Sequence, residues 1–265
     1  MQDLTVILVQ ADLIWENPAK NHQQFSDILT SSITASTDLV ILPEMFSTGF
    51  SMESPRLAET MRGISMQWLT EMAAKHKVVI TGSLIIEENG QYYNRLIWMR
   101  PDGSYSCYNK RHLFRMAGEH KHFAAGNSQL IVELKGWKIR PVICYDLRFP
   151  VWSRNRFSAE SGYEYDFMFF VANWPKVRRD PWMALLKARA IENLAFVAGV
   201  NRVGSDCKDI EYSGDSGMYN FRGELITQMR AGETIAETVT LSAAALHEFR
   251  EKFPAGKDAD QFDIR

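Results

Sequence analysis

Short apolar runs alternate along the chain with segments whose apolar residues recur at helical spacing. This alternation predicts an α/β fold with helices on both faces of the sheet structure. Asn17 followed by Pro18 signals a helix start, and Glu88-Asn89-Gly90 signals a turn between two strands. Strands are expected at 4–10, 39–42, 78–86, 92–99, 104–108, 130–134, 138–144, 166–172, 195–200, 218–221, 224–229 and 234–241, and helices from 18 onward and at about 55–76, 150–161, 180–193 and 243–252.

No linker, repeat or low-complexity segment interrupts this pattern, which predicts a single domain over residues 1–265. The chain is 46% hydrophobic and 23% charged, as in ordinary globular proteins. Its formal net charge of −2 argues against a nucleic-acid or anionic-membrane partner. The apolar runs are too short to span a bilayer, and the N-terminus lacks the basic segment of a signal peptide. Three cysteines without zinc-ligand spacing indicate a reduced, cytoplasmic protein with no metal.

Three of the expected strands end on side chains that can do chemistry, each of a different kind. The strand at 39–42 leads to the carboxylate of Glu44, the strand at 104–108 to the ammonium of Lys110, and the strand at 138–144 to the thiol of Cys144. Ligands of helix-flanked sheets bind outside the strand ends, so these three side chains can share one pocket. A thiol beside a base and a cation is suited to nucleophilic attack on an amide or nitrile carbon.

Each of these residues also has a structural interpretation. Cys144 alone could be a small buried hydrophobe, but the strand pattern stops abruptly after it, which places the thiol at a sharp turn near unpaired backbone N–H groups that lower a thiol pKa. Glu44 could be a surface carboxylate, although apolar residues flank it on both sides and favour a partly buried general base. Lys110 could belong to a solvated basic patch with Arg111 and His112. The remaining cysteines, Cys107 and Cys207, lack such a setting and are expected to have no catalytic role.

The segments around these residues resemble the three signature blocks of the nitrilase (carbon–nitrogen hydrolase) superfamily. The blocks are LPEMFSTGF at 42–50, YNKRHLF at 108–114 and ICYDLRFP at 143–150, in the same order and with the same spacing as in that family. Similarity continues at 172–175, 188–193, 201–204 and 212–217, so it extends over nearly the whole chain. Within the superfamily, the segments at 45–50 and 114–119 favour the omega-amidase branch, whose members remove ammonia from the omega-amides of 2-oxo acids.

The resemblance implies a four-layer α-β-β-α sandwich, a homodimer and no cofactor. It implies that Cys144 is the nucleophile, that Glu44 is the general base and later acid, and that Lys110 with the backbone N–H of Tyr145 stabilises the oxyanion. The family's second glutamate is matched best by Glu119, nine residues past the lysine. Glu133 is an alternative, although its alternation with apolar neighbours is typical of a strand surface.

Substrate recognition calls for residues beyond the catalytic group. The far carboxylate of a 2-oxo dicarboxylic acid monoamide calls for a cationic or hydroxyl partner. Arg148 is a candidate for that contact, with a structural salt bridge to Asp146 or Glu192 as the alternative. Small-pocket walls are expected from three aromatic residues, namely Phe46, Phe114 and Trp174, of which Trp174 could instead belong to the core or an interface.

The favoured function is therefore hydrolysis of such omega-amides through a Cys144 thioester. Two classes of alternative remain open. The same residues could serve a nitrilase, a carbamoyl-amide hydrolase or an aliphatic amidase. The chain could also be a catalytically silent binding protein on this fold, although the presence of Glu44, Lys110 and Cys144 together argues against that class.

Overall fold

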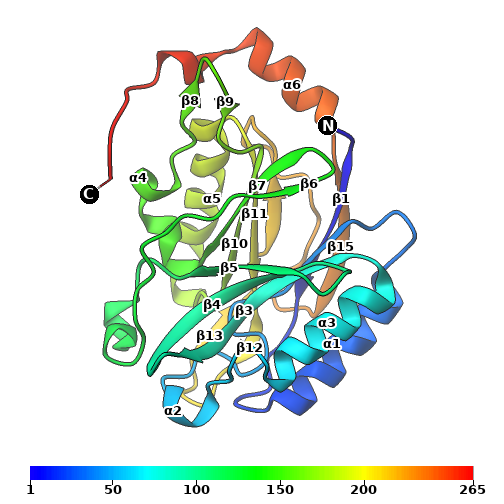
Figure 1. Cartoon of the computed structure of the whole chain (residues 1–265), viewed down its shortest axis with the longest axis vertical. Helices are drawn as coiled ribbons and strands as arrows, with labels where there is room; N and C mark the ends of the chain where they lie inside the picture. The colour runs from blue at the N-terminus through cyan, green and yellow to red at the C-terminus, as the bar shows by residue number, and fades with distance from the viewer. Residues whose placement is uncertain (265) are drawn as a thin grey trace.

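The computed structural model describes residues 1–264, and its core consists of two β-sheets packed face to face (Figure 1). The first sheet has the strand order β15 (Ile235–Leu241), β1 (Leu4–Gln10), β2 (Leu39–Ile41), β3 (Val79–Glu88), β4 (Gln91–Met99) and β5 (Tyr105–Asn109). The second has the order β14 (Gly217–Tyr219), β11 (Phe196–Asn201), β10 (Phe167–Ala172), β7 (Trp137–Ile143) and β6 (Val132–Leu134). In both, parallel central strands are flanked by antiparallel edge strands.

Strand β1 shows why its apolar run is continuous. Val6 and Leu8 join the cluster between the two sheets, whereas Ile7 and Val9 join a second cluster under the outer helices. Successive side chains of a strand point to opposite faces, so a strand buried on both faces is apolar at every position.

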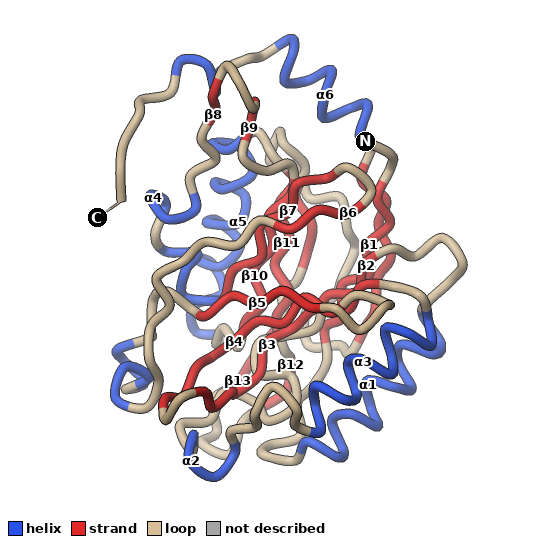
Figure 2. Tube along the Cα trace, in the orientation of Figure 1, coloured by secondary structure: helices blue, strands red, loops and turns tan. Residues whose placement is uncertain are grey.

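Helices cover the outer face of each sheet, which completes the expected four-layer α-β-β-α sandwich (Figures 1 and 2). Helices α1 (Pro18–Ser32) and α3 (Ile64–His76) pack on the first sheet, and α5 (Arg179–Asn193) packs on the second. Gly199 of β11 allows close packing by α5, because a Cβ there would lie 2.4 Å from a methyl carbon of Leu186. Within residues 1–264, no helix is both long and apolar enough to cross a membrane.

Several local predictions are confirmed. Asn17 caps α1, its side chain accepting a hydrogen bond from the Lys20 backbone N–H at 3.2 Å. Asn89 and Gly90 both have positive φ (54° and 75°), as the tight turn between β3 and β4 requires. The C-terminal helix α6 (Ala243–Lys252) has the expected bounds.

Four expectations about local structure are wrong. The helix expected at 150–161 ends as α4 (Pro150–Ser153), because Asn155 hydrogen-bonds to Asn193 and Tyr165 and draws the chain away into the hairpin β8 (Phe157–Ser158) and β9 (Gly162–Tyr163). The helix expected at 55–76 divides into α2 (Ser54–Leu57) and α3, since the Glu59 N–H donates to the Ile85 carbonyl of β3.

The third error concerns the start of α5, which begins at Arg179, so that Asp180 lies in its first turn and does not cap it. The fourth concerns the expected strand at 224–229, which forms only an isolated bridge between Tyr219 and Leu225. The other short elements are the strands β12 (Val203–Ser205) and β13 (Glu211–Ser213), and the 3-10 helices η1 (Arg115–Ala117), η2 (Glu119–Lys121), η3 (Cys144–Arg148), η4 (Lys176–Arg178) and η5 (Ala255–Asp258).

Candidate active site

The chain turns sharply where the strands β2 and β7 end. After β2, Met45 has a φ of 44° and its N–H donates to the Ser83 hydroxyl at 2.8 Å, which holds the neighbouring Glu44 beyond the end of β2. After β7, Cys144 itself has a φ of 42°. A left-handed backbone is uncommon for residues other than glycine and concentrates at functional sites, where surrounding bonds hold it.

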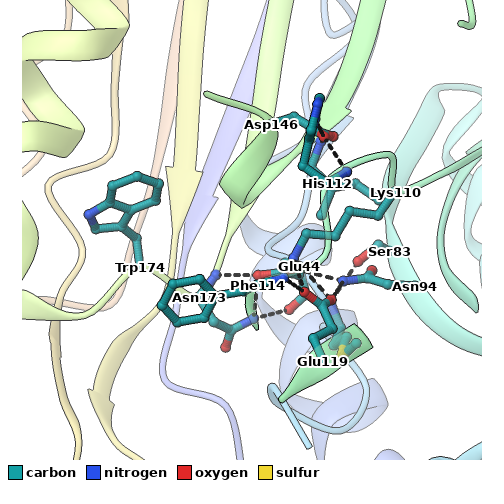
Figure 3. A network of polar contacts seen from close by, with 12 residues as sticks. Glu44, Ser83, Asn94, Lys110, His112, Phe114, Glu119, Asp146, Asn173 and Trp174 are labelled. Atoms are coloured by element: carbon teal, nitrogen blue, oxygen red, sulfur yellow. Dashed lines mark hydrogen bonds and ion pairs between the residues drawn. The ribbon is translucent and has the colours of Figure 1, made fainter. Parts of the chain in front are cut away.

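The Lys110 ammonium contacts the carboxylates of both Glu44 and Glu119. Its ammonium nitrogen lies 2.8 Å from Glu44 Oε1 and 3.0 Å from both carboxylate oxygens of Glu119 (Figure 3). All three side chains are fully buried, while Cys144 retains 8% exposure. The structure thus brings together all four residues expected to form a catalytic group, since Glu44, Lys110 and Glu119 lie near enough to the Cys144 thiol to shift its pKa.

Two asparagines fix the carboxylates. The Asn94 side-chain amide, from β4, donates to Glu44 Oε1 at 2.8 Å and to Glu119 Oε1 at 3.2 Å. The Asn173 backbone N–H donates to Glu44 Oε2 at 2.8 Å, and its side-chain amide donates to the Glu44 carbonyl at 2.6 Å (Figure 3). Glu44 is therefore oriented by residues of both sheets.

Glu119 lies in η2, and its carboxylate also accepts a hydrogen bond from the Phe114 backbone N–H at 2.5 Å. Charge-assisted bonds of this kind fix an acid group more firmly than bonds between neutral groups. The alternative candidate, Glu133, lies exposed on β6.

Asp146 connects the Cys144 turn to the Lys110 strand. Its carboxylate accepts bonds from the Ile143 backbone N–H (3.1 Å), from the Tyr108 hydroxyl (2.8 Å) and from the His112 backbone N–H (3.0 Å). Tyr108 and His112 lie two residues before and two residues after Lys110. Positions of the nucleophile and the cation are therefore coupled through one buried carboxylate.

Burial and the neighbouring charges shift the pKa values of Lys110 and Glu119. Burial alone would lower the pKa of the Lys110 ammonium, but the adjacent carboxylates of Glu119 and Glu44 raise it overall, so Lys110 stays charged. Burial raises the pKa of Glu119, an effect that Lys110 opposes and the nearby charge of Glu44 reinforces.

The Cys144 thiol differs from the sequence-based expectation. Burial raises its pKa well above the usual range, and the carboxylate of Glu44 raises it further, whereas Lys110 lowers it by a smaller amount. The expected lowering at the turn is therefore wrong in direction, because desolvation of the thiolate outweighs the cation. A neutral resting thiol must lose its proton as it attacks, which requires a base next to it.

A cavity of about 660 Å³, including its open mouth, leads from the surface to Cys144. Four of the residues expected to contact substrate line it, namely Tyr145, Phe114, Arg148 and Trp174. Phe46 does not, because it is fully buried under the first sheet, where its ring packs against Phe25, His22 and Trp68. Phe50 and Met52 form the wall that was expected from Phe46.

The sequence analysis assigned no role to Asn94 or Asn173, and it considered Asp146 only as a possible salt-bridge partner of Arg148. Asn173 had a usable signal, because it directly follows the apolar strand β10, as the other site residues follow theirs. Asn94 had none, since a single asparagine within a strand does not reveal which carboxylates face it. Among residues 1–264 no cluster of three or more His, Cys, Asp or Glu side chains has the arrangement of a metal site.

Comparison with known proteins agrees with this geometry. The family model described as Carbon-nitrogen hydrolase matches residues 5–250. The chain is 45% identical to Omega-amidase YafV of Escherichia coli over 264 residues, covering all of both chains. It is 32% identical to the 2-oxoglutaramate amidase of Bacillus subtilis, covering 96% of each.

A solved structure is similarly close. XC1258 from Xanthomonas campestris, a CN-hydrolase superfamily protein whose crystal structure has an arsenic adduct in the active site, is 46% identical and superimposes with a TM-score of 0.97 over 100% of both chains.

Proposed function

The chain belongs to the carbon–nitrogen hydrolase family, and on this premise we propose that it hydrolyses the omega-amide of short 2-oxo dicarboxylic acid monoamides to the 2-oxo acid and ammonia. Suitable substrates are 2-oxoglutaramate and 2-oxosuccinamate. The omega-amidase of Escherichia coli and the 2-oxoglutaramate amidase of Bacillus subtilis each match over at least 96% of the chain, which supports this choice among the reactions of the family.

The observation that carries the chemical part of the proposal is the bridging position of Lys110. Its ammonium contacts Glu44 and both oxygens of Glu119 at 2.8–3.0 Å beside the Cys144 thiol. Glu119 can share one ammonium hydrogen between its two oxygens, and Glu44 uses a second. A third hydrogen is then available for the oxygen of a bound amide, where negative charge develops during attack.

In the first half of the reaction, Cys144 Sγ bonds to the amide carbon while Glu44 accepts the thiol proton. Lys110 and the backbone N–H of Tyr145 stabilise the resulting oxyanion. Glu44 returns the proton to the amide nitrogen, the C–N bond breaks, and ammonia leaves a thioester on Cys144. Glu119 holds Lys110 charged and in place throughout.

In the second half, Glu44 takes a proton from water, and the oxygen attacks the thioester carbon. The S–C bond breaks, the proton returns to Cys144, and the dicarboxylic acid leaves. The net change is addition of one water to the amide, so no cofactor or metal is needed.

The remaining parts of the proposal concern the whole protein. Residues 1–265 act as one domain, in the cytoplasm, without a nucleic-acid partner. Two copies form a homodimer through α4 and α5. Exposed apolar side chains at Val151, Val177 and Ile191 on or next to these helices support a covered face there.

The test is a substrate panel with ammonia release as the readout. Purified protein is given 2-oxosuccinamate, glutamine, an aliphatic amide, a carbamoyl-amide and a simple nitrile under the same conditions. We expect kcat/KM for 2-oxosuccinamate to exceed the others by at least about 100-fold, the discrimination available when a site pairs a substrate charge. Preference for the nitrile or the simple aliphatic amide would contradict the omega-amide assignment, and no turnover of any compound would favour a binding protein.

A further inference from the structure

The cavity above Cys144 contains an excess of positive charge that the reaction chemistry does not use. Three basic side chains line it, namely Arg148, Arg178 and Lys208, together with the single carboxylate of Asp206. The Asp206 carboxylate is hydrogen-bonded to nearby residues of the same segment. It accepts bonds from the Tyr212 hydroxyl at 3.0 Å and from the Lys208 and Ile210 backbone N–H groups at 2.8 and 3.1 Å.

Arg148 enters the cavity from η3, four residues after the nucleophile. Its guanidinium carbon lies 4.9 Å from the centre of the Trp174 ring. Both candidate partners for a structural salt bridge are engaged elsewhere, since Asp146 pairs with His112 and Glu192 with Arg189. In the part of the chain that the structure describes, the Arg148 guanidinium has no hydrogen-bond or ion-pair partner.

Arg178 lines the same cavity and is the last residue of η4. Its guanidinium carbon lies 5.4 Å from the centre of the Phe114 ring. The next residue, Arg179, points to the surface and forms an ion pair with Asp215 at 2.5 Å. Arg178 is half-buried and, within residues 1–264, makes no such pair. Of these two adjacent arginines, Arg179 has a carboxylate partner, whereas Arg178, which lines the cavity, has none within residues 1–264.

Phe114 contacts both the Lys110 cluster and the Arg178 guanidinium. Its backbone N–H donates to Glu119 Oε2, the partner of Lys110, while its ring lies under the Arg178 guanidinium. The two cationic parts of the site are thus separated by a single side chain. A short molecule with an amide at one end and an anion at the other can therefore contact both parts.

We propose that Arg178, together with Arg148, binds the free carboxylate of the substrate and so selects omega-monoamides of short dicarboxylic acids over neutral amides. Guanidinium groups offer paired N–H donors that match both oxygens of a carboxylate. The aromatic rings beneath them hold their planes in place without neutralising them. The inference rests on the proposed function for the identity of the substrate, but the carboxylate site itself can be tested without turnover.

The binding test uses succinamate and butyramide, two amides of equal length that differ in having a carboxylate or a methyl group at the far end. Their dissociation constants are measured by calorimetry on Cys144→Ala protein, which cannot consume them. Adding Arg178→Met is expected to raise the Kd of succinamate about 10- to 100-fold, the usual effect of losing charge-assisted hydrogen bonds. Arg178→Lys keeps the charge but loses the paired donors, so its Kd for succinamate should lie between those of Cys144→Ala protein with and without Arg178→Met. If Arg178→Met does not fold, the Arg178→Lys variant is used for the test instead.

Lys176→Met is the matched control. Lys176 lies in the same 3-10 turn but outside the cavity, where it pairs with Glu211 at 2.8 Å. Its removal subtracts the same charge without touching the cavity, so the Kd of succinamate should stay within about 2-fold, as for a screened surface charge. An equal rise in both variants would indicate a general field effect and overturn the proposal. So would an unchanged Kd in Arg178→Met and Arg148→Met, or failure of succinamate to bind.

A kinetic arm separates this inference from the proposed function. In otherwise wild-type protein, Arg178→Met should lower the ratio of kcat/KM for succinamate over butyramide by the same factor as it raises Kd. If 2-oxosuccinamate is not hydrolysed but Arg178 still determines succinamate binding, the proposed function fails and the carboxylate site stands. If 2-oxosuccinamate is hydrolysed and the ratio does not change, the function stands and the carboxylate site is wrong.

Discussion

The carboxylate of Asp146 accepts a hydrogen bond from the His112 backbone N–H at 3.0 Å, and the His112 ring Nδ1 lies 2.8 Å from the same oxygen. These residues follow the two strand ends that carry Cys144 and Lys110, so their contact sets the distance between nucleophile and cation. The His112 ring also stacks on Phe149 at 3.8 Å, which keeps Nδ1 aimed at the carboxylate.

Asp146→Ala should therefore damage both folding and catalysis. It leaves the Tyr108 hydroxyl and the Ile143 and His112 N–H groups without an acceptor, and we expect a loss of about 3 kcal/mol in free energy of unfolding. The kcat should fall more than KM rises, because the binding wall is untouched. Urea unfolding and steady-state kinetics test this, with exposed Asp27→Ala as control. A variant with normal stability and normal kcat would show that Asp146 does not position the site.

Replacing Lys110 by methionine should abolish most activity and destabilise the protein. The kcat is expected to fall at least about 10²–10³-fold, as for loss of one oxyanion donor. The buried carboxylates of Glu44 and Glu119 would then face each other without a cation, which should cost about 3–5 kcal/mol of folding free energy.

Adding Glu119→Gln to Lys110→Met tests the electrostatic origin of that loss. The second change removes one of the two opposed charges, so part of the stability should return in urea unfolding while activity stays low. Equal stability of the single and double variants would point to lost packing, not charge, as the cause.

Asn94 should tolerate alanine better than aspartate. Asn94→Ala removes one donor to Glu44 and Glu119, with an expected cost of about 1–2 kcal/mol in unfolding free energy. Asn94→Asp places a third carboxylate against those two in a buried site, so its cost at pH 7 should be larger and should shrink as the pH is lowered. Thermal melts between neutral and acidic pH measure the difference in stability between the two variants, and a difference that does not change with pH would contradict the prediction.

The reactivity of the Cys144 thiol should rise with pH well into the alkaline range. Burial and the charge of Glu44 raise its pKa, so only a small fraction is thiolate near neutrality, and that fraction grows as the pH approaches the raised pKa. The rate of iodoacetamide labelling at Cys144, followed by peptide mass spectrometry, should still be increasing above about pH 9. A rate that levels off below pH 7 would indicate a lowered pKa instead.

The sequence predicted the layers and the strand ends well, for a physical reason that β1 illustrates. A strand buried on both faces is apolar at every position, so its end is marked by the first polar residue, as at Glu44 after β2. Cys144 was identified from the abrupt end of the strand pattern after it. Lys110 follows β5, which is polar and largely exposed, so its strand end is marked less sharply. Phe46 was misplaced because an aromatic residue two positions past Glu44 can lie on either side of the sheet. Its direction depends on the left-handed turn at Met45, which sequence does not reveal.

Residues that depend on tertiary pairing could not be found in this way. Asn155, which ends α4, acts through Asn193 and Tyr165, and these partners meet it only in the folded chain. Arg178 is distinguished from Arg179 only by the absence of an anion beside it, and two adjacent arginines in a sequence do not show which one faces a cavity.

The central claim, that Cys144 carries the hydrolysis of an omega-amide, is tested most directly by ammonia release from 2-oxosuccinamate with wild-type and Cys144→Ala protein of equal folded content. We expect sustained release by the wild type and none above the uncatalysed rate by Cys144→Ala, because no thioester can form. Ammonia release that persists in Cys144→Ala would contradict the mechanism.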